Sequence, residues 1–142
     1  MALERTLLII KPDAVAAGNA GSILAMLEGA GGFTVRALRM EQMTTESARE
    51  FYAVHKDRPF YGDLVEFMTS GPCIPMVLER ENAIQALRDF IGATNPAEAA
   101  DGTVRKRYAT NIQNNAVHAS DSAESAAKEI PHFFPAMAVE VG

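Results

Sequence analysis

The sequence predicts an α/β domain of the split βαβ type, in which an antiparallel sheet is covered by helices on one face. Two observations lead to this prediction. The chain has 142 residues, a common size for one compact domain. Segments with the apolar pattern of strands alternate with segments at helical spacing, in the order βαβ and then βαβ with extra helices. We therefore expect a single domain over residues 1–142.

The first half of the chain alternates strand and helix patterns. Residues 6–10 are almost wholly apolar and stop at Lys11-Pro12-Asp13, which predicts a short strand buried on both faces. Apolar residues at helical spacing over 20–29 predict a helix that a group of glycines ends. Alternation over 33–40 indicates a half-buried strand, after which one of two threonines opens a helix over 46–54.

The middle of the chain continues this alternation. An apolar and aromatic segment at 64–68 ends at Thr69-Ser70-Gly71-Pro72, and residues 73–78 have the composition of another strand. Residues 81–91 then predict a helix that ends at Gly92.

The last third of the chain contains an unusually long connection. Residues 92–115 show little periodicity, whereas connections in compact domains are usually about 4 to 6 residues long. A loop of that length usually has a function. It leads to a short candidate strand at 115–119 and to a helix over 122–130 that we expect to end before Pro131.

Composition and charge exclude several classes of protein. Hydrophobic residues make up 48% and charged residues 22%, unlike a disordered chain. The formal net charge of -5 argues against a protein that coats nucleic acid. No apolar run reaches the roughly 20 residues that span a bilayer. Cys73 is the single cysteine and no secretory signal precedes it, so we expect a cytoplasmic protein.

Three histidines are the candidates for chemistry near neutral pH, because imidazole changes its charge there without a large pKa shift. His55 lies in a polar segment, which favours a solvated loop. His132 lies between Pro131 and Phe133, which favours a packing role. His118 lies just before a helix start that Ser120 or Asp121 can cap, so free N–H groups and the positive end of the helix dipole would lie beside it.

The acid at position 129 strengthens the case for His118. Glu129 falls in the last turn of the predicted helix, where a carboxylate faces the negative end of the dipole. A sharp turn between strand and helix would let Glu129 hydrogen-bond one ring nitrogen of His118 and leave the other free to attack. The alternative is that Ser120 and Asp121 only cap a helix and that Glu129 is ordinary surface charge.

Positive charges gather near the strand ends and the long loop of this acidic chain, and they suggest a phosphate pocket. They are Lys11, Arg88, Arg105, Lys106 and Arg107. Each alone is more simply explained as a solvated charge. The chain has no GxxxxGK[ST] loop, no GxGxxG turn after a strand and no pair of cysteines for a structural zinc site.

The segment around His118 resembles a known signature. Residues 115–121, Asn-Ala-Val-His-Ala-Ser-Asp, are similar to the N-x-x-H-G-S-D active-site motif of nucleoside diphosphate kinases. Further matches to that family follow the chain order, at 4–6, 10–15, 51–52, 58–60, 68–72, 92–96, 102–105 and 122–130. The resemblance implies a ferredoxin-like α/β sandwich with a four-stranded antiparallel sheet. It also implies an enzyme that transfers the γ-phosphoryl group of a nucleoside triphosphate, typically ATP, to a nucleoside diphosphate by a ping-pong cycle through phosphohistidine.

The resemblance assigns expected roles residue by residue. His118 is the expected nucleophile, Glu129 the partner of its imidazole, and Ser120 the support of that pair. Lys11, Tyr52, Arg88, Thr94, Arg105 and Asn115 are expected to contact phosphates or sugar hydroxyls. Phe60 is expected to stack on the base, a contact that every base can make. Mg²⁺ is expected to arrive with the nucleotide, held by phosphate oxygens and water rather than by a protein site.

The family also implies a homo-oligomer, a tetramer or hexamer built from dimers. One departure from the signature is Ala119, where the family usually has glycine. If that position requires positive φ, the backbone would be strained and turnover slowed. A nucleotide-binding regulatory protein without turnover is therefore the main alternative to the kinase. Nucleic-acid binding, a third hypothesis, conflicts with the net charge of -5.

Overall fold

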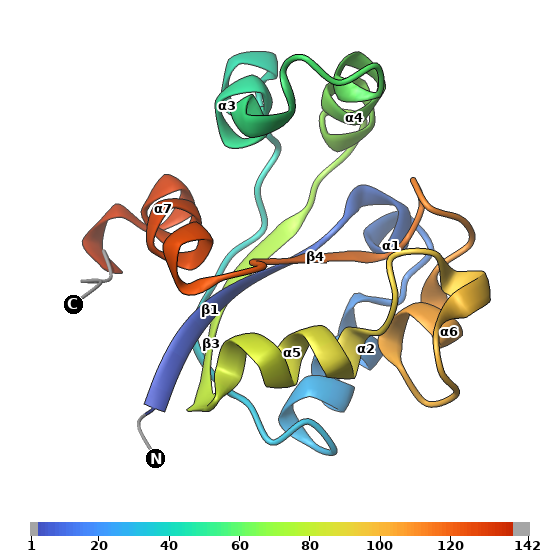
Figure 1. The fold of residues 1–142 in the computed structure, drawn as a ribbon, viewed down its shortest axis with the longest axis vertical. Helices are drawn as coiled ribbons and strands as arrows, with labels where there is room; N and C mark the ends of the chain where they lie inside the picture. Colours follow the sequence, from blue (N-terminus) through green and yellow to red (C-terminus); the bar gives the residue numbers. More distant parts are fainter. Residues whose placement is uncertain (1–2, 138–142) are drawn as a thin grey trace.

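A computed structural model describes residues 3–137 and shows one four-stranded antiparallel sheet (Figure 1). Its strands are β1 (Leu3–Ile10), β2 (Thr34–Leu38), β3 (Ile74–Glu81) and β4 (Val117–Ala119). Their order across the sheet is β2-β3-β1-β4, so the two long strands are central and β2 and β4 are the edges. The predicted fold class, a split βαβ sandwich with an antiparallel sheet, is confirmed.

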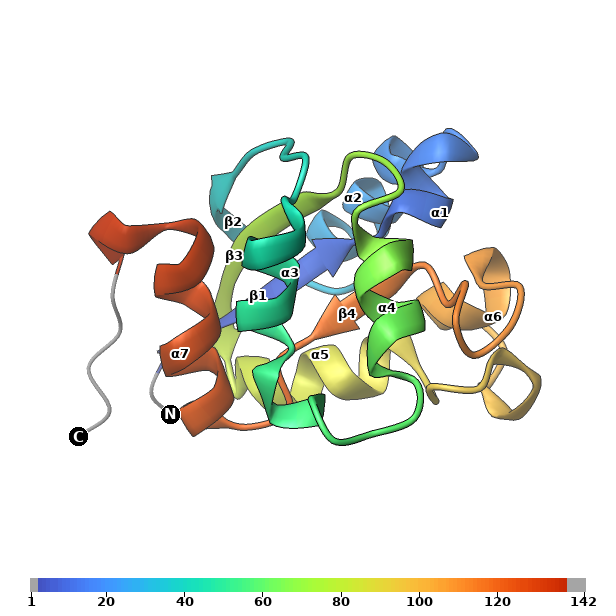
Figure 2. The same cartoon turned by 90° about the horizontal axis from the view of Figure 1, so that it is seen from above.

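Helices cover both faces of this sheet, so the expectation of helices on one face is wrong. Figures 1 and 2 show α2 (Ala20–Glu28) and α5 (Ala83–Ile91) on one side. On the other side lie α3 (Thr45–Phe51), α4 (Tyr61–Met68) and α7 (Ala123–Phe133).

The reason is the continuous apolar run of β1. Successive side chains of a strand point to opposite faces. Leu8 and Ile10 therefore belong to the core under α2 and α5, while Leu7 and Ile9 belong to the core under α3, α4 and α7. All four are completely or almost completely buried. A strand that is apolar on both faces needs a helical layer on each.

The sequence predicted a long loop over residues 92–115, but the connection between α5 and β4 contains helical structure. It contains a 3₁₀ turn at Pro96–Glu98 and the short helix α6 (Val104–Tyr108), which the Thr103 side chain caps by accepting from the Lys106 N–H. α6 packs against α5 and brings Arg105 back to the sheet. Shorter elements complete the chain: α1 (Pro12–Ala16) and 3₁₀ turns at Ala53–His55 and Pro135–Met137.

The last helix differs from the prediction at both ends. Ser122, rather than Ser120 or Asp121, is the N-cap residue of α7, and its hydroxyl accepts from the Ser125 N–H at 3.1 Å. The helix also continues past Pro131 to Phe133. Proline lacks an N–H and should weaken a helix, but here it stands only in the last turn, where the helix is held by buried Ile130 and Phe133.

Among residues 3–137, no helix is both long and apolar enough to cross a membrane.

The packing of α7 yields a first prediction. Ile130 is fully buried against the sheet, so Ile130→Ala should lower the free energy of unfolding by about 2–5 kcal/mol. Lys128→Ala, on the exposed side of the same helix, should change it by about 0.5 kcal/mol or less. Urea unfolding at one fixed protein concentration measures both values. Similar losses for the two variants would contradict this packing.

Candidate active site

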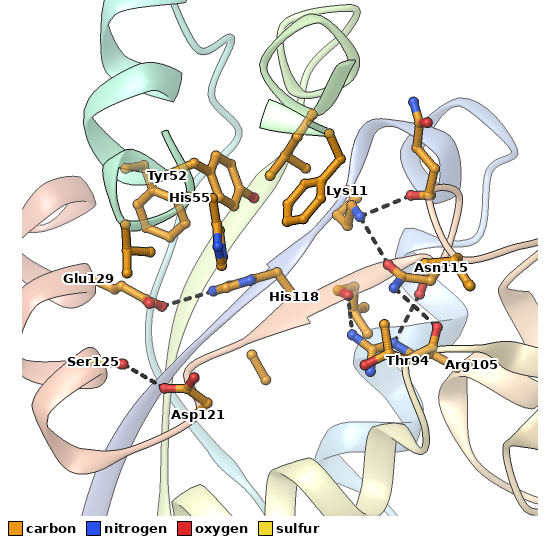
Figure 3. A pocket seen from close by; sticks show the side chains of 18 of the residues that line it. Lys11, Tyr52, His55, Thr94, Arg105, Asn115, His118, Asp121, Ser125 and Glu129 are labelled. Atoms are coloured by element: carbon orange, nitrogen blue, oxygen red, sulfur yellow. Dashed lines mark hydrogen bonds and ion pairs between the residues drawn. The ribbon is translucent and has the colours of Figure 1, made fainter. Parts of the chain in front are cut away.

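A pocket of about 780 Å³ lies where β4 meets the α3–α4 hairpin and the connection after α5 (Figure 3). It is open to solvent, and the residues that line it come from distant parts of the chain. The lining residues are Lys11, Phe51, Tyr52, Val54, His55, Phe60, Asp63, Leu64, Arg88, Thr94, Arg105, Ile112, Gln113, Asn115, Val117, His118, Ala119, Asp121, Ser125 and Glu129. Nine of the ten residues predicted for the site are in this set, and the tenth, Ser120, is fully buried and hydrogen-bonds Glu129 of the lining.

His118 is the middle residue of β4 and pairs with Ile9 of the central strand. Its Nε2 lies 2.8 Å from Glu129 Oε1, and the Ser120 hydroxyl donates to the same oxygen at 2.8 Å. A carboxylate oxygen can only accept, so Nε2 bears the proton of the neutral ring. The lone pair of Nδ1 is then free. The sequence hypothesis that a turn brings Glu129 back to His118 agrees with this geometry.

Two aromatic rings hold the imidazole from the side of α3. The rings of Phe51 and Tyr52 approach the His118 ring edge-on, at centroid distances of 5.4 and 6.1 Å. Phe51 also contacts His132 and Phe133, so α7 supports it from behind. Burial, with Glu129 nearby, raises the pKa of Tyr52. Its hydroxyl therefore stays protonated and remains a hydrogen-bond donor at neutral pH.

Lys11 is a buried cation at the end of β1, only 6% exposed. Its ammonium donates to Asn115 Oδ1 at 2.9 Å and to the Gln113 carbonyl at 3.0 Å. Burial lowers the pKa of Lys11 to about 8, against the opposing effect of Asp13. Lys11 forms no ion pair with any acid among the described residues, so its charge is available to an anion.

Arg105 is a second buried cation, 5% exposed. Its guanidinium donates to the carbonyls of Gly92 and Val117 at 3.0 and 2.9 Å, which fixes its direction. Burial, with Arg88 nearby, lowers its pKa to about 10, so it remains charged at neutral pH. Three cations, Lys11, Arg88 and Arg105, thus line the pocket that His118 enters, in a chain that is acidic overall.

The remaining predicted residues lie around these groups. Asn115 is buried and donates from its amide to the Thr94 carbonyl at 3.3 Å, joining the two sides of the long connection. Phe60 lies at the mouth of the pocket and is 47% exposed, a suitable surface for stacking. Lys106 and Arg107, which the sequence grouped with the other cations, are exposed and do not line the pocket.

His55 is a pocket residue that the sequence analysis assigned to a solvated loop. Its ring packs against the Phe60 ring at a centroid distance of 5.4 Å and an interplanar angle of 55°, and it points into the pocket (Figure 3). The polar neighbours of His55 gave no indication of this position, because the pocket wall forms only when the hairpin folds over β4. Ile112 is also in the lining and was not predicted.

Two further expectations concern Ala119 and metals. Ala119 lies in β4, and the non-glycine residues with positive φ among those described are Asn82 and Ala116. Ala119 therefore does not have the positive φ that would strain its backbone. No group of three or more His, Cys, Asp or Glu side chains within residues 3–137 could hold a metal ion.

The fold and the site together define a class of protein. An imidazole whose neutral form leaves Nδ1 free, held by a carboxylate in one pocket with three cations, has the groups needed to accept a phosphoryl group. These are the features of a phosphotransferase that uses a histidine nucleophile.

Comparisons with known proteins identify the family. The nucleoside diphosphate kinase family model matches residues 4–139. The nucleoside diphosphate kinase of Chlorobium luteolum is 56% identical over 134 residues, covering 94% of this chain and 95% of the relative. That of Persephonella marina is 55% identical with the same coverage. The chain belongs to the nucleoside diphosphate kinase family and is a nucleotide-binding transferase.

Solved structures agree with this assignment. A crystal structure of the Aquifex aeolicus nucleoside diphosphate kinase superimposes with a TM-score of 0.93 at 46% identity, covering 98% of this chain and 100% of the other. The enzyme of Encephalitozoon cuniculi superimposes with a TM-score of 0.90 at 32% identity, covering 98% and 94%. The resemblance inferred from residues 115–121 is confirmed.

The buried ammonium of Lys11 yields a pH prediction. Its pKa is about 8 in the folded protein and 10.5 ordinarily, so between these values the unfolded chain binds more protons. The free energy of unfolding therefore increases as pH rises, by on the order of 3 kcal/mol in total. Lys11→Met keeps the apolar stem and removes this contribution. Urea unfolding at a series of pH values should show the difference growing in favour of the wild type, and a constant difference would contradict it.

Proposed function

We propose that His118 Nδ1 is the nucleophile of this kinase and that its phosphorylated form is the intermediate between two half-reactions. The observation that supports this most strongly is the 2.8 Å contact between His118 Nε2 and Glu129 Oε1. In the neutral ring it puts the proton on Nε2 and leaves the Nδ1 lone pair free, in the pocket that Lys11, Arg88 and Arg105 also line. The family is known to work by a ping-pong cycle through phosphohistidine, in agreement with a single nucleophile in a single pocket.

In the first half-reaction, the Nδ1 lone pair forms a bond to the γ-phosphorus of the triphosphate. The bond from that phosphorus to the β,γ-bridging oxygen breaks, and the nucleoside diphosphate leaves with the electron pair. The ring retains its Nε2–H and becomes positively charged. Glu129 stabilises that charge through the hydrogen bond it already accepts, and Ser120 holds the carboxylate in place.

The second half-reaction reverses the first with a different nucleotide. A terminal oxygen of a bound nucleoside diphosphate attacks the phosphorus on Nδ1, the N–P bond breaks, and its electron pair returns to the ring. The same cations serve both directions, because in each case they neutralise the equatorial oxygens of the moving group.

In our proposal, different pocket residues bind different parts of the nucleotide. Lys11, Arg88 and Arg105 supply positive charge to the phosphates, and the Tyr52 hydroxyl donates to the moving group. Thr94 and Asn115 contact phosphates or sugar hydroxyls. Phe60 stacks on the base. Because stacking needs only a π face, the site would accept several bases.

Mg²⁺ fits this site as a companion of the nucleotide. The pocket offers carboxylates singly, among them Asp121, and no cluster among the described residues could enclose the ion. Magnesium keeps several waters and is commonly held by substrate phosphates. When bound, it would neutralise phosphate charge. The protein residues would position that complex against His118.

We also propose a single domain over residues 1–142 and a cytoplasmic location. Both cores share one sheet, and the family model spans residues 4–139. The cytoplasm contains the nucleoside triphosphates that serve as phosphoryl donors.

A homo-oligomer, a tetramer or hexamer built from dimers, is the proposed assembly. Its structural support is the edge strand β2, which within residues 3–137 pairs with β3 alone. Leu38 and Met40 beside this edge are 46% and 61% exposed. An open strand edge with apolar side chains favours pairing with another chain.

The central prediction concerns the phosphorylated intermediate. Incubation with ATP labelled at the γ-phosphate should give an acid-labile phosphoprotein, because a phosphoramidate bond hydrolyses in acid. His118→Ala should take up no label, whereas His132→Gln, a histidine outside the pocket lining, should still be labelled. Label on the His118→Ala protein would contradict the proposal.

The carboxylate partner can be tested separately. Glu129→Gln retains the size of the side chain but cannot balance the charge of the phosphorylated ring. Rapid-quench measurement should show labelling slowed on the order of 10²-fold. A wild-type labelling rate would mean that Glu129 does not support His118.

The assembly proposal makes its own prediction. Light scattering should give the wild type a multiple of the monomer mass, and Leu38→Glu on β2 should lower that mass because a carboxylate would be buried in the contact. Lys56→Glu, an exposed change in the α3–α4 hairpin, should leave it unaltered. An unaltered mass for Leu38→Glu would exclude β2 as the contact.

A further inference from the structure

A strained turn lies between Asn115 and the strand that holds His118. The Val117 N–H donates to the Asn115 carbonyl at 2.8 Å, a three-residue γ-turn with Ala116 at its centre. The φ of Ala116 is 71°, which is the rare, strained form of this turn. A residue with a β-carbon adopts such a conformation only where its surroundings enforce it.

Both sides of Ala116 are held by the segment that follows β1. The Ala116 N–H donates to Asp13 Oδ2 at 3.1 Å, and the Lys11 N–H donates to the Ala116 carbonyl at 2.8 Å. Ala116 itself is fully buried. The Asp13 carboxylate therefore supplies the acceptor for a buried N–H that the turn directs away from the sheet.

The turn determines the positions of Asn115 and Val117, which bind the Lys11 ammonium and the Arg105 guanidinium. Asn115, on one side of it, receives the Lys11 ammonium on its Oδ1. Val117, on the other side, receives the Arg105 guanidinium on its carbonyl and is followed by His118. A change in the Ala116 peptide would move both cations relative to the imidazole.

We propose that Asp13 is a positioning residue for phosphoryl transfer: its carboxylate fixes the γ-turn at Ala116 and thereby aligns His118 with the phosphate-binding cations. This inference rests on the function proposed above. Asp13 does not line the main pocket, so it acts through other residues.

The charge of Asp13 has a second consequence, at Lys11. Asp13 of α1 raises the pKa of Lys11, while burial and Arg105 of α6 lower it. The Phe67 ring of α4 faces the same ammonium at 5.1 Å, as do the oxygens of Asn115 and Gln113. Removing the charge of Asp13 would therefore let Lys11 lose its proton at lower pH.

Two substitutions separate the effect of Asp13 on the γ-turn from its effect on the pKa of Lys11. Asp13→Ala removes the acceptor of the Ala116 N–H, and kcat/KM for phosphoryl transfer between ATP and a diphosphate should fall by about tenfold or more. Asp13→Asn still presents a carbonyl oxygen to that N–H but has no charge. It should keep a kcat near that of the wild type at about pH 6.5, where Lys11 remains protonated. We expect KM to rise at alkaline pH, where Lys11 loses its proton, and in Asp13→Asn this rise should begin at lower pH.

A rescue variant distinguishes positioning from general stability. Glycine adopts positive φ without steric cost, so Ala116→Gly added to Asp13→Ala should restore most of the lost kcat/KM. Glu46→Gln serves as a matched control, because Glu46 is also an acid in the first turn of a helix but lies outside the pocket. It should leave kcat/KM and its pH profile unchanged.

Asp13→Ala with wild-type kcat/KM would overturn the inference, and so would a loss that Ala116→Gly does not repair. If Asp13→Ala does not fold, an Asp13→Asn profile identical to that of the wild type overturns the charge effect on Lys11. The γ-phosphate labelling of His118 is measured on the same proteins. Absence of label at His118 in the wild type refutes the proposed function, whereas normal labelling with unaffected Asp13 variants refutes only this inference.

Discussion

The site depends on one carboxylate that accepts two hydrogen bonds. Glu129 Oε1 accepts from His118 Nε2 and from the Ser120 hydroxyl, each at 2.8 Å. The first bond selects the tautomer of the imidazole, and the second orients the acid. Because the acid comes from α7 and the imidazole from β4, this contact also requires that strand, turn and helix pack as they do.

The surrounding fold explains why the cations lie opposite the imidazole. β1 is central in the sheet, and its end delivers Lys11 next to β4. The connection after α5 then brings Arg105 and Asn115 to the same place, with Arg105 held by three backbone carbonyls rather than by an acid. Positive charge is thus concentrated in the pocket that His118 lines, although the chain as a whole has a net charge of -5.

Much of this arrangement could be predicted from local sequence, and the failures have physical reasons. The strand at 6–10 was predicted as buried on both faces, and that property already required helices on both faces of the sheet. The helix α6 has only five residues, too few for a periodic pattern. His55 was missed because its neighbours are polar, and the γ-turn because alanine gives no signal of positive φ. The pairing of His118 with Glu129 could be predicted because both residues lie within one strand–turn–helix unit.

The tautomer of His118 tests the account most directly. Nitrogen-15 NMR of the protein labelled in its histidines reports which ring nitrogen bears the proton, and the His118 signal is assigned from its absence in a His118 variant. We expect Nε2 to be protonated and Nδ1 to be free in the neutral ring, and Glu129→Ala to abolish this preference. A neutral His118 with the proton on Nδ1 would contradict the central claim, because Nδ1 would then have no lone pair to form a bond to phosphorus.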